Sequence, residues 1–346
     1  MTDTQIPPPA PDAAHRGGGL WDQHGRQIRD LRLSVTDRCN FRCQYCMEPD
    51  VRFLPRMSLL TLKEYVRVAD LFQRLGVTKI RLTGGEPTLF SALDELIDEL
   101  GAMGFEDMAM TTNGSLVTPQ RLLRWKRGGL RRLTFSLDSL DPERVAMITR
   151  STTPLEKVLD AIKAAIAADL NPVKINAVIM RGVNDSEIPA FAELARQLGV
   201  DVRLIEFMPL DSARAWSRDR LVPARDVMEA LHKVHGLEQM EADHAHSTSQ
   251  NWRFTDGTPG RIGVIAPVTQ PFCGACHRIR MTAEGCVRPC LFSDTEWDLR
   301  PLLRGGGTDE QIMKRIVDAT WPKQAGHGIT SPSFVQPRRT MSSIGG

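Results

Sequence analysis

The sequence lacks the features that direct a protein into a membrane, out of the cell or onto a charged polymer. No run approaches the ~18 uninterrupted apolar residues of a membrane span, and the N-terminal segment MTDTQIPPPAPDAAHRGGG has no apolar core of a signal peptide. The formal net charge is only +2, which predicts no overall attraction to nucleic acid or to a membrane surface. We therefore expect a cytoplasmic protein without nucleic-acid or membrane partners.

Cysteine is also absent from most of the chain, and its seven residues lie in two short windows. The first window holds Cys39, Cys43 and Cys46, and the second holds Cys273, Cys276, Cys286 and Cys290. An odd number of cysteines in a reducing compartment argues against a disulfide framework. Such close grouping is typical of metal ligands.

What is present is typical of a globular enzyme-sized chain. The 346 residues are 41% hydrophobic and 25% charged, and at ~150 residues per domain they suggest about two domains. Residues 1–25 are rich in Pro, Ala and Gly without any period, which predicts a disordered N-terminal arm.

From residue 28 onwards, strand-like and helical patterns alternate. Strands are expected at 31–35, 79–82, 108–111, 132–137, 173–180 and 201–207, and helices at 61–75, 91–103, 119–127, 154–168 and 186–198. Such βα units favour parallel pairing, but a full eightfold barrel takes ~250 residues. The sequence therefore predicts an α/β fold, a partial (β/α)6 TIM-like barrel over residues 26–210, with a doubly wound sheet as the alternative. Residues 211–346, with a helix near 223–233 and a second cysteine window, are expected to form a C-terminal cluster-binding module.

Polar and glycine-rich segments follow the expected strands. They are Thr36-Asp37-Arg38-Cys39, Thr83-Gly84-Gly85-Glu86-Pro87, Thr112-Asn113-Gly114, Ser136-Leu137-Asp138 and Glu206-Phe207-Met208-Pro209. In βα barrels the carboxyl ends of the strands build the active site, so we expect these segments to share one rim. The His244-x-His246 pair has no cysteine or carboxylate cluster beside it, which favours a solvated loop over a metal site.

The first window has the spacing C-x3-C-x2-C, with Tyr45 before the third cysteine. A structural zinc site takes four ligands, whereas three thiolates on a four-iron cluster leave one iron open. This window and the segment from Gly84 to Pro87 resemble motifs of the radical S-adenosylmethionine (SAM) superfamily. The resemblance implies a [4Fe-4S] cluster on Cys39, Cys43 and Cys46, with SAM bound at its open iron and lined by Tyr45, Gly85, Ser136 and Met208.

The second window could form a closed zinc site through C-x2-C-x9-C-x3-C. However, Arg278 and Arg280 alternate on a strand-like segment directly after Cys276. Alternation places both guanidinium groups on one face, where they suit an anionic ligand such as a phosphate. A purely structural zinc site would not require them.

The segment FCGACHRIRMTAEGCVRPCLF and the terminal Ile344-Gly345-Gly346 resemble the GTP 3′,8-cyclase family of molybdenum cofactor biosynthesis. The resemblance covers about residues 28–346. It implies a second [4Fe-4S] cluster on Cys273, Cys276 and Cys290, whose open iron binds guanine. It also implies GTP contacts from Arg32, Lys79, Arg81, Thr112, Lys174, Arg203, Arg278 and Arg280, and a catalytic set of Arg278, Arg280, Gly345 and Gly346.

The implied reaction is SAM-dependent radical conversion of GTP to (8S)-3′,8-cyclo-7,8-dihydroguanosine 5′-triphosphate. The 5′-deoxyadenosyl radical removes the hydrogen at C3′, and the resulting radical attacks C8 of guanine. No P-loop is present, so side-chain cations would bind the triphosphate. The resemblance further implies an electron donor, a downstream enzyme that receives the molybdopterin precursor, and a homodimer.

Two positions depart from the family pattern. His277 stands where Asn is usual, and either donates a hydrogen bond or titrates near neutral pH. Cys286 is an extra thiol, interpreted as free because Cys290 keeps the family spacing. Two competing functions remain: another radical SAM enzyme with an auxiliary cluster, and a zinc-stabilised binding module. From the residues alone, a frayed terminus is the favoured interpretation of the Gly-Gly end, over a tail that enters the active site.

Overall fold

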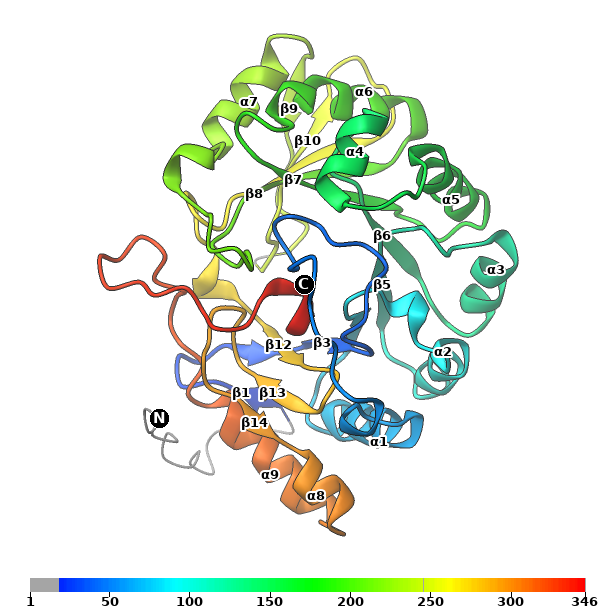
Figure 1. Cartoon of the computed structure of the whole chain (residues 1–346), viewed down its shortest axis with the longest axis vertical. Coiled ribbons are helices and arrows are strands. Elements are labelled where there is room, and N and C mark those ends of the chain that lie inside the picture. Colours follow the sequence, from blue (N-terminus) through cyan, green and yellow to red (C-terminus); the bar gives the residue numbers. More distant parts are fainter. Residues whose placement is uncertain (1–18, 245, 346) are drawn as a thin grey trace.

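The sheet at the centre of the molecule is curved but open, with helices packed around its outer face (Figure 1). The computed structural model describes residues 19–244 and 246–345. Its strands are β1 (Leu20–Trp21), β2 (Gln27–Ile28), β3 (Asp30–Ser34), β4 (Lys79–Thr83), β5 (Asp107–Thr112), β6 (Arg132–Ser136), β7 (Lys174–Ile179), β8 (Asp201–Glu206), β9 (Leu237–Gln239), β10 (Gln250–Phe254), β11 (Arg261–Ile265), β12 (Arg278–Met281), β13 (Cys286–Arg288) and β14 (Trp297–Asp298). Its α-helices are α1 (Leu62–Arg74), α2 (Leu93–Ala102), α3 (Pro119–Arg127), α4 (Pro142–Thr149), α5 (Leu155–Ala167), α6 (Ile188–Leu198), α7 (Ala224–His232), α8 (Arg300–Arg304) and α9 (Asp309–Thr320).

The six predicted strands and their helices are confirmed, each to within two residues. Strands β3 to β8 run parallel and in sequence order, which is the expected partial barrel. The doubly wound alternative is wrong, because neighbouring strands follow one another without a reversal of order.

Strands from the C-terminal part of the chain extend this sheet at both edges. β12 pairs in parallel with β3, and β11 pairs in parallel with β8. Antiparallel strands then finish each edge, so that the described sheet runs β14-β13-β12-β3-β4-β5-β6-β7-β8-β11-β10-β9. The sheet therefore continues across residue 210, and the second cysteine window lies beside the first strand of the barrel.

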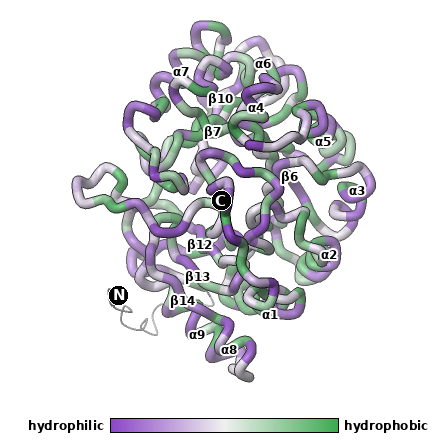
Figure 2. The backbone as a smooth tube through the Cα atoms, in the orientation of Figure 1, coloured by the Kyte–Doolittle hydropathy of each residue, from purple (hydrophilic) through white to green (hydrophobic). Residues whose placement is uncertain are grey.

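The amphipathic helices are formed as their sequences predict. In α1 the hydroxyl of Thr61 accepts from the backbone N–H of Glu64, whose carboxylate accepts in return from the backbone of Thr61. Tyr65 and Phe72 then fall on the buried face. Figure 2 shows hydrophilic and hydrophobic residues alternating along the helices that surround the sheet. None of the helices in the described ranges is long and apolar enough to cross a bilayer.

The two ends of the described chain are ordered. β1 pairs with β2, and Leu20 is fully buried, so the predicted arm is wrong for its last residues; residues 1–18 lie outside the described part. At the other end, the tail crosses the mouth of the barrel (Figure 1), and Ile344 is fully buried. The frayed-terminus alternative is therefore wrong for residues up to Gly345, while Gly346 lies outside the described residues.

Candidate active site

One cavity of about 310 Å³ lies inside the curved sheet and is lined by cysteines from both windows. Its volume is in the range of small-molecule sites. The first window follows the carboxyl end of β3, whereas Cys273 and Cys276 precede the amino end of its neighbour β12. The two windows consequently lie toward opposite ends of the barrel with the cavity between them. Six thiols line this cavity: Cys39, Cys43, Cys46, Cys273, Cys276 and Cys290.

The cysteines of the first window are half-buried in the cavity wall, and their thiols have few protein partners. Burial raises the pKa of Cys39 to about 11 and that of Cys46 to about 12. Cys39 Sγ accepts from the backbone N–H of Phe41 at 3.3 Å and from Asn113 Nδ2 at 3.9 Å. Burial without a cation disfavours thiolates, whereas bound metal stabilises them. Three such sulfurs on one cavity wall fit an iron–sulfur cluster.

The second window offers a thiolate beside cations. Burial alone would raise the pKa of Cys276, but Arg278 and Lys323 outweigh it and lower the pKa to about 6. Cys286 differs, because it does not line the cavity and its ligand atom lies within 4.8 Å of those of Glu284 and Glu296. This placement supports three ligands and one free thiol, and argues against a closed four-cysteine zinc site.

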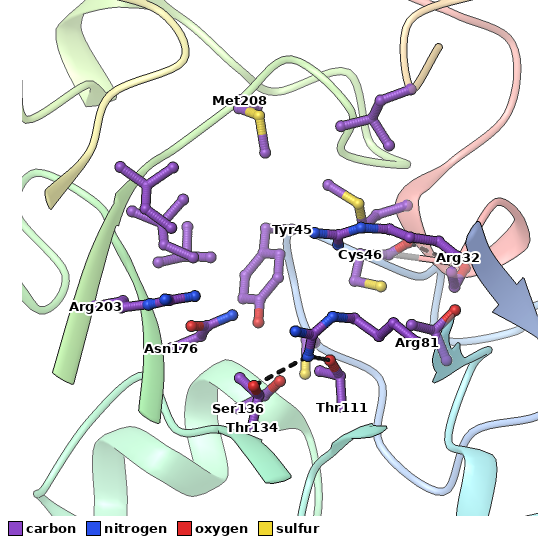
Figure 3. Close-up of a pocket in the computed structure, with 18 of the residues that line it drawn as sticks. Arg32, Tyr45, Cys46, Arg81, Thr111, Thr134, Ser136, Asn176, Arg203 and Met208 are labelled. Carbon is purple, nitrogen blue, oxygen red and sulfur yellow. Dashed lines mark hydrogen bonds between the residues drawn. The ribbon is translucent and has the colours of Figure 1, made fainter. Parts of the chain in front are cut away.

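Five arginines line the same cavity: Arg32, Arg81, Arg203, Arg278 and Arg280. None of them forms an ion pair with a carboxylate among the residues that the structure describes. Figure 3 shows Arg81 and Arg203 pointing into the cavity from facing walls, and Arg81 donates to Thr111 and Thr134 at 3.3 and 3.1 Å.

Burial destabilises the charged form of these arginine side chains. It lowers the pKa of Arg32 to about 9 and those of Arg81 and Arg203 to about 10, with nearby arginines adding to the effect. The Nε of Arg32 is buried without a hydrogen-bond partner. Uncompensated buried cations are unfavourable unless a ligand neutralises them, so the cavity is suited to a polyanion.

Two predicted GTP contacts lie away from the cavity lining. Lys79 and Lys174 are the first residues of β4 and β7, at the amino end of the sheet. Lys174 Nζ is 3.5 Å from Asp201, and burial together with Arg203 lowers the pKa of Lys174 to about 7. Both lysines belong to the same end of the barrel as Arg278.

The four predicted SAM-lining residues, Tyr45, Gly85, Ser136 and Met208, all line the cavity (Figure 3 labels three of them). Gly85 packs so closely that a Cβ would lie 2.3 Å from the carbonyl oxygen of Arg38. The position therefore requires glycine.

Three polar residues of the site, two of them buried, were not assigned a role from the sequence. Glu86 accepts from the hydroxyls of Thr88 and Thr112 at 2.6 and 2.7 Å, which gives the predicted GTP contact Thr112 a protein partner. Asp138 accepts from the Tyr45 hydroxyl at 2.8 Å. Asn176 lines the cavity and its Oδ1 has no partner. Glu86 and Asp138 belong to the polar segments that follow predicted strands, and this position was the sequence signal for them. Asn176 is a polar residue within an apolar strand.

The C-terminal tail contributes to the site from inside the barrel. Ser342 lines the cavity and its hydroxyl donates to the carbonyl of Cys46 at 3.3 Å. Arg280 donates to the carbonyl of Gly345. Gly345 has φ +71°, and a Cβ there would lie 2.3 Å from Ser34 Oγ and 2.6 Å from Thr83 Oγ1.

His277 packs outside the cavity lining. Its Nε2 lies 4.0 Å from Asp30, and its ring centroid is 4.0 Å from that of His246. Burial lowers the pKa of His277 to about 4, which favours the hydrogen-bonding alternative over titration near neutral pH. Since His246 is half-buried against it, the expectation of a fully solvated loop holds only for the exposed His244.

Comparisons with known proteins agree with this arrangement. Residues 33–195 match the radical SAM superfamily, and residues 200–329 match the family described as Molybdenum Cofactor Synthesis C. In fold, the chain resembles Streptococcus suis SuiB bound to S-adenosylmethionine (TM-score 0.58, 14% identity, 89% of this chain and 67% of that one). It also resembles anSMEcpe with bound AdoMet (TM-score 0.56, 14% identity, 87% and 82%). Fold and site thus define a radical SAM protein.

Curated relatives narrow this class. A GTP 3′,8-cyclase of Corynebacterium glutamicum is 41% identical over 94% of this chain and 89% of its own length. One of Paenarthrobacter nicotinovorans is 40% identical over 98% of this chain and all of its own, and one of Streptomyces coelicolor is 42% identical over 94% and 96%. The chain belongs to the GTP 3′,8-cyclase family.

Proposed function

We propose that this chain is a GTP 3′,8-cyclase, which converts GTP to (8S)-3′,8-cyclo-7,8-dihydroguanosine 5′-triphosphate in the first step of molybdenum cofactor biosynthesis. The observation that carries the proposal is one cavity lined by both cysteine trios and by five arginines, none of which pairs with a carboxylate in the part of the chain that the structure describes. The names of the curated relatives support the same activity.

The residues present fit two [4Fe-4S] clusters and SAM. Cys39, Cys43 and Cys46 would hold one cluster, and Cys273, Cys276 and Cys290 the other. When bound, these groups supply an electron for SAM cleavage, a hydrogen-abstracting radical and an open iron for the guanine base. The SAM site would be lined by Tyr45, Gly85, Ser136 and Met208.

The arginines are proposed to bind GTP. Arg32, Arg81, Arg203, Arg278 and Arg280 present planar donors that suit phosphate oxygens. Lys79 and Lys174 add positive charge at the amino end of the barrel, and Thr112 lines the wall. We infer that the triphosphate extends toward that end.

The contribution of the protein to the reaction is positional. Forming a C3′–C8 bond requires these two carbons to be held together, with the C3′ hydrogen facing the SAM site. Asp138 fixes the Tyr45 hydroxyl, and Glu86 fixes Thr112, so the wall is rigid where the substrates meet. We assign Arg278, Arg280, Gly345 and Gly346 to the catalytic set, where Arg280 and the tail close the cavity. Closure excludes water from a radical reaction.

Several further properties of the protein are proposed from the family resemblance. They are an external electron donor, a downstream molybdopterin-precursor enzyme, a homodimer and a cytoplasmic location. We also propose the division into residues 26–210 and 211–346. No specific observation favours another radical SAM enzyme, and the placement of Cys286 outside the cavity disfavours a zinc-stabilised module.

The direct test is incubation of anaerobically reconstituted protein with GTP, SAM and a reductant. The expected products are 5′-deoxyadenosine and the 3′,8-cyclised nucleotide. Arg203→Gln should lose GTP turnover, whereas Arg253→Gln, at an exposed position of β10, should retain it. Colourless protein with stoichiometric zinc, or no GTP-dependent 5′-deoxyadenosine, would overturn the proposal.

A further inference from the structure

The C-terminal tail is held by a salt bridge outside the cavity as well as by contacts inside it. The guanidinium of Arg339 lies between two carboxylates: Nη1 is 2.5 Å from Glu284 Oε1, and Nε is 2.6 Å from Glu296 Oε1. A second contact, from Nη2 to Glu296 Oε2 at 2.6 Å, makes the pairing with Glu296 bidentate. We call these three residues the Arg339 clasp.

The clasp is shielded from solvent. The side chains of Glu284 and Glu296 are 8% and 19% exposed, and that of Arg339 is 29% exposed. Glu296 also pairs with Arg288, but Glu284 has no second ion-pair partner among the described residues. Release of Arg339 would leave the Glu284 charge buried and unpaired, which is strongly unfavourable. The closed clasp is therefore favoured.

Cys286 forms part of the same cluster. It lies on β13, is buried, and its Sγ is within 4.8 Å of the carboxylate ligand atoms of Glu284 and Glu296. Burial and the two carboxylates raise its pKa to about 12, so it stays a neutral thiol. Cys286 does not line the cavity, and arginines already pair with both carboxylates beside it, so its thiol packs beneath the clasp.

The clasp lies a short distance along the chain from the cavity. Gly345 is the sixth residue after Arg339, and six residue steps span at most ~21 Å. Within it, Ser342 donates to the carbonyl of Cys46, and Gly345 accepts from Arg280. The same segment thus touches the loop of the first cysteine trio and an arginine on β12, beside the second trio.

We propose that the Arg339 clasp positions the C-terminal tail over the cavity, which makes Arg339 a positioning residue for the reaction. The inference rests on the proposed function, since it assigns the tail a part in that reaction. Arg339 does not line the cavity, so it acts only through the segment that it holds. Glu284 and Glu296 are positioning residues for the same reason, because they are the carboxylate partners of Arg339.

The test compares Arg339→Met with Arg253→Met in the reconstituted holoenzyme. Methionine keeps an apolar stem and removes the charge, and Arg253 pairs with Glu238 at 2.8 Å on an exposed surface. Amide hydrogen exchange of residues 341–345 should accelerate ~10-fold or more in Arg339→Met, as loss of a charged hydrogen-bonded pair predicts. Formation of cyclised product should fall in parallel while iron content stays near the wild-type value, and the melting temperature should fall because the buried Glu284 carboxylate loses its partner. Arg253→Met should change neither quantity.

Two further variants keep the proposal testable if Arg339→Met does not fold. Arg339→Lys keeps one charge but loses the fork, so exchange and turnover should lie between wild type and Arg339→Met. Glu284→Gln removes one carboxylate without leaving a buried charge, and should accelerate exchange in the same segment to a smaller degree.

The outcomes separate the clasp from the proposed function. If residues 341–345 of Arg339→Met and Glu284→Gln exchanged their amide hydrogens at the wild-type rate, the proposal would be overturned. The contacts inside the cavity would then be enough to hold the tail in place. Faster exchange with undiminished product would also overturn it, because the tail would not require positioning. A wild-type protein that makes no cyclised product would refute the proposed function, while the exchange data would still report on the clasp.

Discussion

Replacement of Gly345 by alanine tests whether the reaction requires the C-terminal tail to pack closely inside the barrel. Its φ of +71° is in the left-handed region, where a Cβ costs roughly 1–2 kcal/mol. The added Cβ would also lie 2.3 Å from Ser34 Oγ and 2.6 Å from Thr83 Oγ1, and such overpacking costs ~1–3 kcal/mol. The two effects together destabilise the docked tail by about 2–5 kcal/mol, which lowers its population relative to the undocked tail ~30-fold or more.

The matched control is Gly257→Ala. Gly257 has a similar φ of +76°, but no atom lies within 4 Å of the Cβ that alanine would add. It carries the backbone strain without the close approach, and it lies in the exposed turn between β10 and β11. Both variants should unfold at slightly lower temperature than the wild type.

The assay is the rate of cyclised product from GTP, measured with equal iron content in all three proteins. We expect the rate of Gly345→Ala to be at least tenfold lower than that of the wild type, and the rate of Gly257→Ala to equal it. Equal rates for Gly345→Ala and the wild type would refute the reasoning, because the reaction would then not require close packing of the tail between β3 and β4.

The other predictions concern the second cluster, the charge of a buried lysine and one core hydrogen bond. Cys290→Ala should contain about four iron atoms per chain and Cys286→Ala about eight, as two four-iron clusters require; the opposite result would make Cys286 the ligand. Burial beside Arg203 lowers the pKa of Lys174 to about 7, so the Lys174 amine of the free protein is largely neutral at pH 8 and should take up a proton when GTP binds. Calorimetry in buffers of different ionisation enthalpy should measure this proton uptake, and Lys174→Gln should abolish it. Binding of GTP to the wild type without proton uptake would contradict the prediction. Because the folded-state pKa of Lys174 lies below 10.5, its contribution to stability should rise with pH between about 7 and 10.5. Trp125→Phe removes the 2.7 Å hydrogen bond from Nε1 to Asp94 and should cost ~1–2 kcal/mol in urea unfolding, whereas an unchanged midpoint would show that the bond contributes nothing.

The regular part of the fold could be predicted because local pattern and tertiary structure agree there. Thr61 and Glu64 cap α1 as the sequence indicates, and each predicted strand occupies its predicted segment. Helix α4 was missed because only Val145 and Ile148 mark its buried apolar face, although Asp141 before Pro142 forms a regular N-cap.

The site was only partly predictable, because its assembly depends on pairing between distant segments. Nothing local in the sequence shows that β12 joins β3, and this pairing is what brings the second cysteine window to the cavity. The partners of Glu86, of Asp138 and of Arg339 are likewise far away in sequence. Residue type and motif identified the ligands and cations and already favoured Cys286 as the free thiol. The geometry supports this choice, because Cys286 does not line the cavity.

The measurement that tests the central claim most directly is the fate of the C3′ hydrogen of GTP. Reconstituted protein would be given GTP deuterated at C3′, SAM and a reductant, and the 5′-deoxyadenosine would be analysed by mass spectrometry. The account predicts one deuterium in 5′-deoxyadenosine and its loss from C3′ of the cyclised product. Unlabelled 5′-deoxyadenosine formed alongside cyclised product would contradict it, because the cavity would then not present C3′ to the SAM site.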